Sequence, residues 1–376
     1  MNNYLENLNE EQKLPVLHKD GPLIVIAGAG SGKTRVLTYR IIHLINEGVD
    51  PFNILALTFT NKAALEMKNR ISLITSESVS RSIWMGTFHS IFARILRSEA
   101  PLIGYPTNFT IYDTYDSEKL ISNIIKEKKL DKDTYKAKSI KNRISSLKNN
   151  FITVENYFNN SELIEVDKAA KRDLFGEIYQ EYVRRCFKAS VMDFDDLLLK
   201  TNELLNKSPE TLLKYQQKFK YILVDEYQDT NYSQYLIVKA LADRHENLCV
   251  VGDDSQSIYS FRGANIDNIL NFKKHYPNSI SYKLEQNYRS TKNIVQAANS
   301  LINHNILKLD KTIWTDNDVG DKIILNKSLS DSEEGRYVSS NIFELKNNFQ
   351  LNNSSFAVLY RTNAQSRSIE DALRKI

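Results

Sequence analysis

The sequence predicts an α/β protein in which helices cover both faces of a parallel β-sheet. Short apolar runs, typical of buried strands, occur at residues 23–26, 54–59, 221–224, 248–251 and 280–284. Helical patterns separate these runs, and short apolar strands that alternate with helices favour parallel pairing in one covered sheet. A third observation is the interval at residues 91–195, which is lysine-rich and helical in pattern.

The domain organisation follows from that interval. Because it lies between two strand-rich stretches that complete one sheet, we predict a first α/β domain from residues 1–90 and 196–285, with a helical domain, residues 91–195, inserted into it. After residue 290 the alternation resumes, with a helix expected at 290–305, strands at 322–329 and 355–361, and a helix at 366–376. Residues 286–376 are therefore predicted to be the first part of a second α/β domain.

Composition argues against several classes of function. The 376 residues carry 50 Lys and Arg against 46 Asp and Glu, a net charge of +4, which favours a mixed solvated surface over a strongly basic one. The two cysteines stand far apart without histidines at ligand spacing, which argues against a disulfide framework or a zinc site. We see no signal peptide and no apolar run of membrane length, so we expect a cytoplasmic protein without a membrane partner.

A phosphate-binding loop is predicted at residues 23–41, LIVIAGAGSGKTRVLTYRI, where a strand, a glycine-rich turn and a helix follow one another. The end of the pattern GxxxxGK[ST] is met, with alanine at its first position. Backbone N–H groups of such a loop surround phosphate oxygens, the lysine reaches the β- and γ-phosphates, and the hydroxyl binds Mg²⁺. An accidental match in a glycine-rich turn is disfavoured by the flanking strand and helix. The predicted ATP-binding residues are Ala27, Gly28, Ala29, Gly30, Ser31, Gly32, Lys33 and Thr34.

Two carboxylates complete this predicted site. The apolar run at 221–224 ends in Asp225 and Glu226, and parallel strands deliver ligand-binding groups at their carboxyl ends. We expect Asp225 to hold Mg²⁺ through water and Glu226 to orient and deprotonate the attacking water. An Asp-Glu pair is common by itself, and its meaning comes from the preceding strand and the phosphate loop. Chemistry alone therefore predicts an NTPase that uses Mg²⁺.

Seven motifs occur in a fixed order: AGAGSGKTRVLTYRI, LTFTNKAALEMKNRI, GTFHSIFARILR, VMDFDDLL, VDEYQDTN, VVGDDSQSIYSFRGA and LEQNYRS, followed by KTIWT and AVLYRTNAQSR. Over nearly its whole length the chain resembles the UvrD/PcrA/Rep-type DNA helicases of superfamily 1. The resemblance implies a RecA-like P-loop fold for the first α/β domain and an incomplete second RecA-like domain. It also implies 3′–5′ ATP-dependent movement on single-stranded DNA, action at single-strand/double-strand junctions, and repair or replication proteins as partners.

The resemblance assigns further roles around the nucleotide. Gln12 would read the adenine edge, although an isolated glutamine at this place is more often surface decoration. Arg35 and Tyr288 would sandwich the adenine ring. Gln256 would sense the γ-phosphate, and Arg289 would act as an arginine finger.

DNA contacts are implied for a third group of residues. Bases stack on aromatic faces without sequence preference, while hydroxyls and amides hold phosphates. For the phenylalanines the alternative is core packing, and for the histidine it is a buried imidazole; the motif context favours DNA contact. The group comprises Phe59, Thr60, Asn61, Thr87, Phe88, His89, Tyr259, Phe261 and Arg262, with Arg361 and Asn363 as weaker candidates at DNA or the nucleotide cleft.

Charged clusters elsewhere are interpreted as structural or left open. Asp193, Asp195 and Asp196 are predicted to be helix-start carboxylates at a domain junction rather than a metal site. The lysines from Lys126 to Lys148 line either a duplex-binding surface or a solvated helix face.

Two departures from the family pattern matter. Phe261 stands where the family usually has tryptophan, which predicts a weaker grip on DNA. The later family motifs, including a second arginine finger, do not follow Ile376, so we expect ATP and DNA binding with slow hydrolysis and poor unwinding by this chain alone. A truncated helicase with a complementing C-terminal fragment, one half of a split helicase, and a non-enzymatic remnant that binds ATP and DNA stay open. An unrelated P-loop enzyme, such as a kinase or transport ATPase, is disfavoured because it requires none of these DNA motifs.

Overall fold

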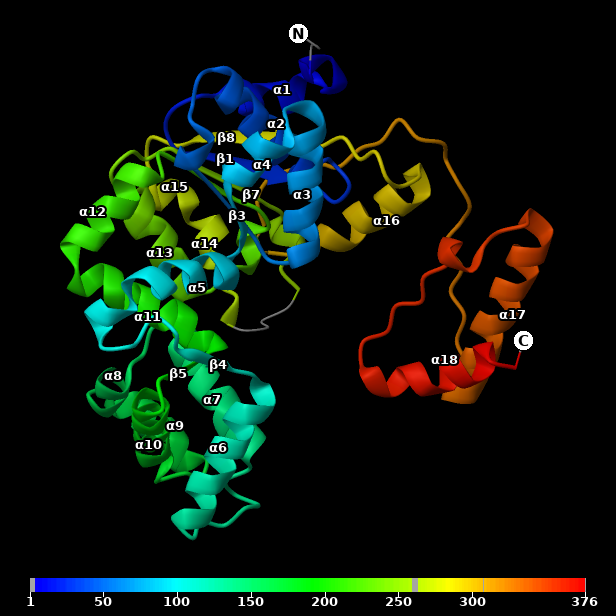
Figure 1. Ribbon diagram of the computed structural model, residues 1–376. Coiled ribbons are helices and arrows are strands. Elements are labelled where there is room, and N and C mark those ends of the chain that lie inside the picture. Colours follow the sequence, from blue (N-terminus) through cyan, green and yellow to red (C-terminus); the bar gives the residue numbers. More distant parts are fainter. Residues whose placement is uncertain (1–3, 259–262, 307, 376) are drawn as a thin grey trace. The chain divides into compact units, whose positions relative to one another are not determined.

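The computed structural model describes residues 4–258, 263–306 and 308–375. The chain divides into two compact units, Met1–Val319 and Gly320–Ile376. The larger unit contains the sheet and the helices drawn from blue to yellow in Figure 1. Among the described residues, none of the helices combines the length and apolarity that a membrane crossing requires.

A six-stranded parallel sheet forms the centre of the larger unit, in the order β3-β2-β6-β7-β1-β8. All five predicted strands are confirmed, and the sixth, β3, was missed because WMGT is short and contains a glycine. The α/β fold class is likewise confirmed. The strands are β1 (Leu23–Ala27), β2 (Ile54–Thr58), β3 (Trp84–Thr87), β6 (Tyr221–Val224), β7 (Leu248–Gly252) and β8 (Ile280–Leu284).

Helices cover both faces of this sheet because its strands are apolar on both sides. In β1, Leu23 and Val25 belong to one buried cluster, whereas Ile24 and Ile26 belong to the other, as the alternation of side chains along a strand requires. The first cluster is covered by α1 (Glu10–Leu17), α2 (Lys33–Asn46) and α3 (Asn61–Ile74), with α4 (Glu77–Ser82) beside α3. The second is covered by α5 (Phe88–Glu99), α11 (Phe194–Lys207), α12 (Pro209–Lys218), α13 (Tyr232–Ala242), α14 (Asp267–Leu270) and α15 (Phe272–His275).

A helical part with its own core lies below the sheet in Figure 1. Its helices are α6 (Thr114–Glu127), α7 (Ala137–Asn149), α8 (Val154–Phe158), α9 (Ser161–Ala169) and α10 (Phe175–Lys188). Two short parallel strands, β4 (Thr110–Tyr112) and β5 (Val191–Asp193), pair where the chain enters and leaves it. Helix α5, by contrast, packs in the core of the main sheet. The domain boundaries at residues 90 and 195 stay a prediction.

The junction between the helical part and the sheet is polar and buried. Asp193 is the N-cap of α11 and forms a capping box with Asp196, as predicted for helix-start carboxylates. The ammonium of Lys148 lies 2.7 Å from Asp193 and 2.8 Å from Asp196, and its side chain is fully buried. Lys148 therefore belongs to neither of the two lysine surfaces considered for residues 126–148.

Helices dominate the rest of the chain. Helix α16 (Lys292–Ile302) confirms the one expected at 290–305. In the smaller unit α17 (Asp331–Phe349) packs on α18 (Ser366–Leu373), which confirms the last predicted helix. The strands predicted at 322–329 and 355–361 are wrong. An apolar run becomes a strand only where another strand pairs with it, and among the described residues neither segment has such a partner.

Candidate nucleotide site and aromatic pocket

The loop between β1 and α2 has the conformation that its glycines permit. Gly30 and Gly32 have φ of 69° and 90°, which is left-handed backbone that glycine adopts without strain. Ser31 folds back on the loop, because its Oγ donates a hydrogen bond of 2.7 Å to the carbonyl oxygen of Gly28. Helix α2 then begins at Lys33, so the loop leads directly into a helix N-terminus. This is the geometry of an anion-binding loop.

Two side chains of α2 meet the two carboxylates that follow β6. The Nζ of Lys33 lies 2.8 Å from Oε2 of Glu226, and Oγ1 of Thr34 donates to Oδ2 of Asp225 at 3.3 Å. Burial, and then the negative charge of Glu226, raises the pKa of Asp225 to about 6. A hydroxyl and a carboxylate are oxygen donors of the kind that Mg²⁺ prefers. The predicted lysine, hydroxyl and carboxylates are therefore brought together, and their donor set fits Mg²⁺ with a nucleotide phosphate.

The side chain of Gln12 is hydrogen-bonded to the backbone of the phosphate loop. Its Nε2 donates to the carbonyl oxygen of Ser31 at 2.9 Å, and its Oε1 accepts from the backbone N–H of Asn9 in a capping box at the start of α1. A Cβ on Gly32 would lie 2.9 Å from this amide. The side chain is buried, so the alternative of a surface glutamine is wrong. Its role towards adenine stays a prediction.

The segment after β8 lies against the same loop. The backbone N–H of Tyr288 donates to the carbonyl oxygen of Gly30 at 3.1 Å, and Nδ2 of Asn287 donates to that of Ala29 at 2.6 Å. A Cβ on Gly30 would meet Cβ of Arg289 at 2.9 Å, so the predicted arginine finger begins beside the loop. Asn287 was not predicted, although it stands inside the motif that supplied Tyr288 and Arg289.

The two predicted adenine-stacking side chains have other partners here. The hydroxyl of Tyr288 accepts from Nδ2 of Asn9 at 2.6 Å, and its ring is half exposed. The guanidinium of Arg35 lies over the ring of Tyr39, 5.7 Å from its centroid. Both side chains flank the loop, and their stacking on adenine stays a prediction.

Gln256 is held by an acidic loop that follows β7. Its Nε2 donates to Oδ2 of Asp253 at 2.5 Å, while Nζ of Lys311 lies 2.9 Å from Oδ1 of the same carboxylate. Lys311 also pairs with Asp254. Two residues further on, the side chain of Ile313 fills the space beside Gly28, where any Cβ would overlap it. Lys311 opens the segment KTIWT that extends the family resemblance, but no role was predicted for it.

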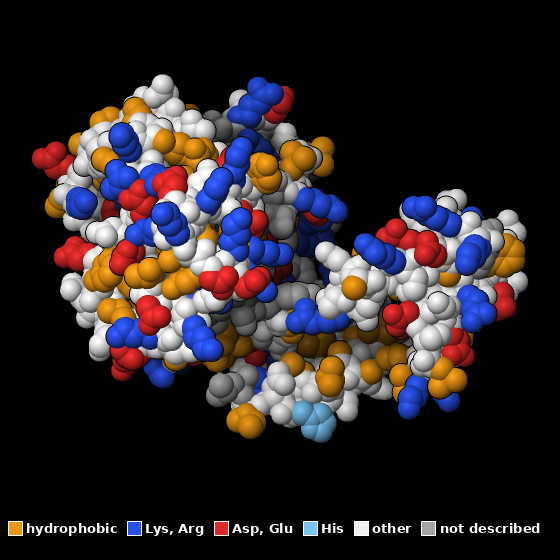
Figure 2. All heavy atoms as spheres, turned by 90° about the horizontal axis from the view of Figure 1, so that it is seen from below, with side chains coloured by type: hydrophobic (Ala, Val, Ile, Leu, Met, Phe, Trp, Pro, Cys, Tyr) orange, Lys and Arg blue, Asp and Glu red, His pale blue; other side chains and the backbone are white. Residues whose placement is uncertain are grey.

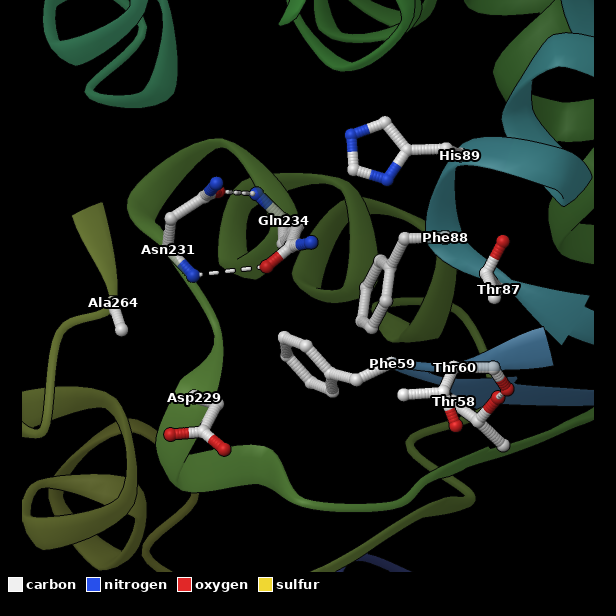
Figure 3. Close-up of a pocket in the computed structure, with 10 residues that line it drawn as sticks. All are labelled: Thr58, Phe59, Thr60, Thr87, Phe88, His89, Asp229, Asn231, Gln234 and Ala264. Carbon is white, nitrogen blue, oxygen red and sulfur yellow. Dashed lines mark hydrogen bonds between the residues drawn. The ribbon is translucent and has the colours of Figure 1, made fainter. Parts of the chain in front are cut away.

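A second site lies where β2 and β3 end, as a pocket of about 500 Å³ beside the aromatic rings of Phe59 and Phe88 (Figure 3). Parallel strands bring their carboxyl ends to one edge of the sheet, so the residues after β2 and β3 converge there. Five of the predicted DNA-facing residues line this pocket, together with five residues that were not predicted. The lining is Thr58, Phe59, Thr60, Thr87, Phe88, His89, Asp229, Asn231, Gln234 and Ala264.

The two phenylalanines differ in exposure. Phe88 is 1% exposed and packs on Phe92 with ring centroids 6.1 Å apart, which is the core position considered as its alternative. Phe59 is only partly buried, and its ring centroid lies 5.7 Å from that of Phe88. Phe59 therefore offers a ring to the pocket, and Phe88 supports that ring. His89 lies edge-on to Phe194, with centroids 6.1 Å apart.

The opposite wall of the pocket comes from the segment that follows Glu226. Asn231 and Gln234 form the capping box that starts α13, drawn as two dashed lines in Figure 3. Burial, and then the charge of Glu226, raises the pKa of Asp229 to about 6. This wall was not predicted, because Asp229 and Asn231 entered only as letters of the motif VDEYQDTN and Gln234 belongs to none of the quoted motifs.

Of the remaining DNA candidates, Tyr259, Phe261 and Arg262 fall outside the described residues. Asn61 is exposed at the start of α3, and Arg361 is exposed in the smaller unit. On the face of the larger unit seen in Figure 2, Lys and Arg side chains are interspersed with Asp and Glu, in keeping with the small net charge.

Comparison with known proteins gives consistent matches. Residues 8–277 match the UvrD/REP helicase N-terminal domain, and residues 282–376 match the UvrD-like helicase C-terminal domain. The chain is 48% identical over 375 residues to ATP-dependent DNA helicase PcrA of Bacillus subtilis, covering 100% of this chain and 50% of that protein. It is 47% identical over 369 residues to the protein of the same name from Leuconostoc citreum, covering 98% and 48%. The chain thus spans about half the length of the curated relatives it matches.

Proposed function

This chain belongs to the UvrD/REP helicase family, and we propose that it is the ATP-binding and single-stranded-DNA-binding part of a 3′–5′ DNA translocase or helicase. The observation that carries this proposal is the placement of two sites at the carboxyl edge of one sheet. The phosphate loop follows β1, and the aromatic pocket follows β2 and β3. The curated relatives are named ATP-dependent DNA helicases, which supports the same assignment.

In the proposed reaction the phosphate loop and Lys33 bind the β- and γ-phosphates of ATP. Thr34 and Asp225 would hold Mg²⁺, which neutralises charge on the phosphate oxygens. Glu226 orients and deprotonates the attacking water, Gln256 contacts the γ-phosphate, and Arg289 neutralises charge that develops in the transition state. Lys33 already lies at Glu226, so nucleotide binding must move its ammonium from the carboxylate towards the phosphates.

In the proposed DNA site a base stacks on the partly buried ring of Phe59. Thr60, Thr87 and His89 line the same pocket, and they would donate hydrogen bonds to the sugar-phosphate backbone. Stacking is independent of sequence, as a motor that steps along any strand requires. We further propose that the substrates include single-strand/double-strand junctions. Repair or replication proteins and a complementing C-terminal fragment are the proposed partners, and the proposed location is cytoplasmic.

ATP hydrolysis with and without oligothymidylate tests this function. We expect single-stranded DNA to stimulate turnover, and Lys33→Ala to abolish it because the β- and γ-phosphates lose their cation. Lys168→Ala is the matched control, since Lys168 is an exposed lysine paired with Glu165 far from both sites. Turnover that ignores DNA, or that survives in Lys33→Ala, would contradict the motor function. Binding of both ligands without turnover would favour the non-enzymatic alternative.

A further inference from the structure

Gln228 is a buried glutamine whose side chain touches three parts of the two sites. It lies in the short 3-10 turn Tyr227–Asp229, and it is 1% exposed. Its Nε2 donates to Oε2 of Glu226 at 2.9 Å and to Oδ2 of Asp229 at 3.4 Å. Its Oε1 accepts from the backbone N–H of Asp253 at 3.0 Å. Glu226 is the proposed catalytic base, Asp229 lines the aromatic pocket, and Asp253 holds Gln256.

The orientation of this amide is fixed by its neighbours. An amide –NH₂ has two hydrogens, and here each is directed at a different carboxylate. The flipped amide would place its oxygen against both carboxylates and its –NH₂ against a backbone N–H. Gly252 leaves room for the side-chain amide of Gln228, because a Cβ on residue 252 would lie 2.7 Å from Oε1 of Gln228. The side chain therefore has one arrangement that satisfies all its polar atoms.

The hydrogen bond to Glu226 becomes more important when nucleotide binds. In the structure Oε2 of Glu226 accepts from both Lys33 and Gln228. A phosphate attracts the ammonium of Lys33, and Gln228 then remains as the donor to that oxygen. Glu226 also has a left-handed backbone, with φ of 48°, which costs free energy in a non-glycine residue and needs its surroundings to hold it.

We propose that Gln228 is a positioning residue that couples occupancy of the aromatic pocket to the orientation of Glu226. Asp229 and Glu226 share one –NH₂ group, so a DNA strand that contacts Asp229 changes how firmly the same group holds Glu226. This coupling role rests on the proposed function, since it takes single-stranded DNA as the pocket ligand and ATP as the loop ligand. By linkage, each ligand changes the affinity of the other by the same factor.

The test measures binding of a fluorescent, non-hydrolysable ATP analogue with Mg²⁺, in the presence and absence of saturating oligothymidylate. We expect DNA to change the nucleotide affinity of the wild-type chain by about tenfold, within the usual range of coupling between sites. Gln228→Met keeps the shape but removes the amide, and we expect the coupling factor to fall below about twofold. Gln228→Glu keeps the acceptor for Asp253 and removes the –NH₂, so the same loss is expected even if the methionine variant folds poorly.

Gln216→Met is the matched control. Gln216 is a partly buried glutamine of the same unit whose Nε2 donates to the carbonyl oxygen of Ala240 at 2.7 Å, away from both sites. Full coupling in this variant, with coupling lost in both Gln228 variants and each ligand still bound singly, supports the role. Coupling that is absent from the wild type, or unchanged in the Gln228 variants, overturns it. Wild-type coupling without ATP turnover contradicts the motor function alone and leaves the role of Gln228 standing.

Discussion

At the carboxyl edge of the sheet, three carboxylates share a few cationic and hydrogen-bond-donating side chains. Asp225, Glu226 and Asp229 follow one strand, and Lys33 lies close enough to counter their charge. Glu226 is also fixed through its backbone, because the N–H of Asp229 donates to its carbonyl oxygen at 2.9 Å. A substitution at Asp229 is therefore expected to affect both the aromatic pocket, which Asp229 lines, and the proposed catalytic base, Glu226.

Asp229→Asn tests the electrostatic effect of this carboxylate on DNA binding. The pKa of Asp229 is raised to about 6, so the group is charged at pH 7.5 and largely protonated at pH 5.5. A negative charge near a DNA phosphate costs about 1 kcal/mol at 4 Å in water. We measure the affinity for oligothymidylate by fluorescence anisotropy at pH 7.5 and at pH 5.5. As the pH falls, we expect the affinity of the wild type to rise about fivefold more than the affinity of Asp229→Asn.

The comparison of these two proteins cancels the contribution of histidines, which gain charge over the same pH range in both. Equal pH dependence in wild type and Asp229→Asn would show that this carboxylate does not face the bound strand.

Residues that belong to a local motif were predictable, and residues that act across the fold were not. Lys33 and Thr34 are adjacent in sequence, and Asp225 and Glu226 end a predicted strand, so their meeting followed from the fold class. Lys311 contacts Asp253 from a loop more than fifty residues away, and such a pairing depends on a chain path that periodicity does not specify. Gln228 stood inside a recognised motif, but its contact with Asp253 appears only when the loops after β6 and β7 converge.

Secondary-structure elements show the same division. Apolar runs predicted five strands of the main sheet, and four of these, β1, β2, β6 and β7, are buried along their whole length, whereas the edge strand β8 is exposed over most of its residues. The segment 322–329 also contains an apolar run, yet Leu325 and Leu329 are almost fully exposed in the structure. Whether an apolar run pairs depends on a neighbouring strand, and this information is absent from the run itself.

Helices α7 and α11 join the helical part to the sheet through buried polar groups. Nδ2 of Asn231, in the wall of the aromatic pocket, donates to Oδ1 of Asn149 at 2.7 Å, and Asn149 in turn donates to Asp195 at 3.1 Å. Burial, and then the charge of Asp193, raises the pKa of Asp196 above its ordinary value, while Lys148 opposes this shift. The position of the helical part is thereby tied to a residue of the pocket.

Lys148→Met tests how much this junction stabilises the larger unit. Removing the ammonium leaves two buried carboxylates without a cation, and breaking a buried ion pair in this way typically costs about 3–5 kcal/mol. We expect the free energy of unfolding, measured in urea, to fall by about 3 kcal/mol. Lys168→Met removes an exposed lysine instead and should change it by less than about 0.5 kcal/mol. Equal stability of the two variants would mean that the junction is not held by this ion pair.

At the scale of the molecule, parallel topology explains why both sites share one unit. The loops after β1, β6 and β7 carry the phosphate loop, the carboxylates and Gln256, and those after β2 and β3 carry the aromatic pocket. All five loops leave the same edge of the sheet, which is the edge where open α/β sheets bind ligands. Parallel pairing thus accounts for the two sites lying at one edge of the sheet, while the wall formed by Asp229, Asn231 and Ala264 could be found only in the folded chain.

The most direct test of whether the larger unit binds DNA beside its nucleotide site asks whether DNA affinity depends on a base that can stack on Phe59. Affinity is measured for oligothymidylate and for an abasic oligonucleotide of equal length and charge, with wild type, Phe59→Ala and the exposed control Phe52→Ala. Stacking contributes about 1–3 kcal/mol per base, so wild type and Phe52→Ala should prefer oligothymidylate by about tenfold or more. Phe59→Ala should lose most of that preference while retaining its affinity for the ATP analogue. Equal binding of both oligonucleotides by the wild type, or an undiminished preference in Phe59→Ala, would contradict the assignment of the pocket to DNA.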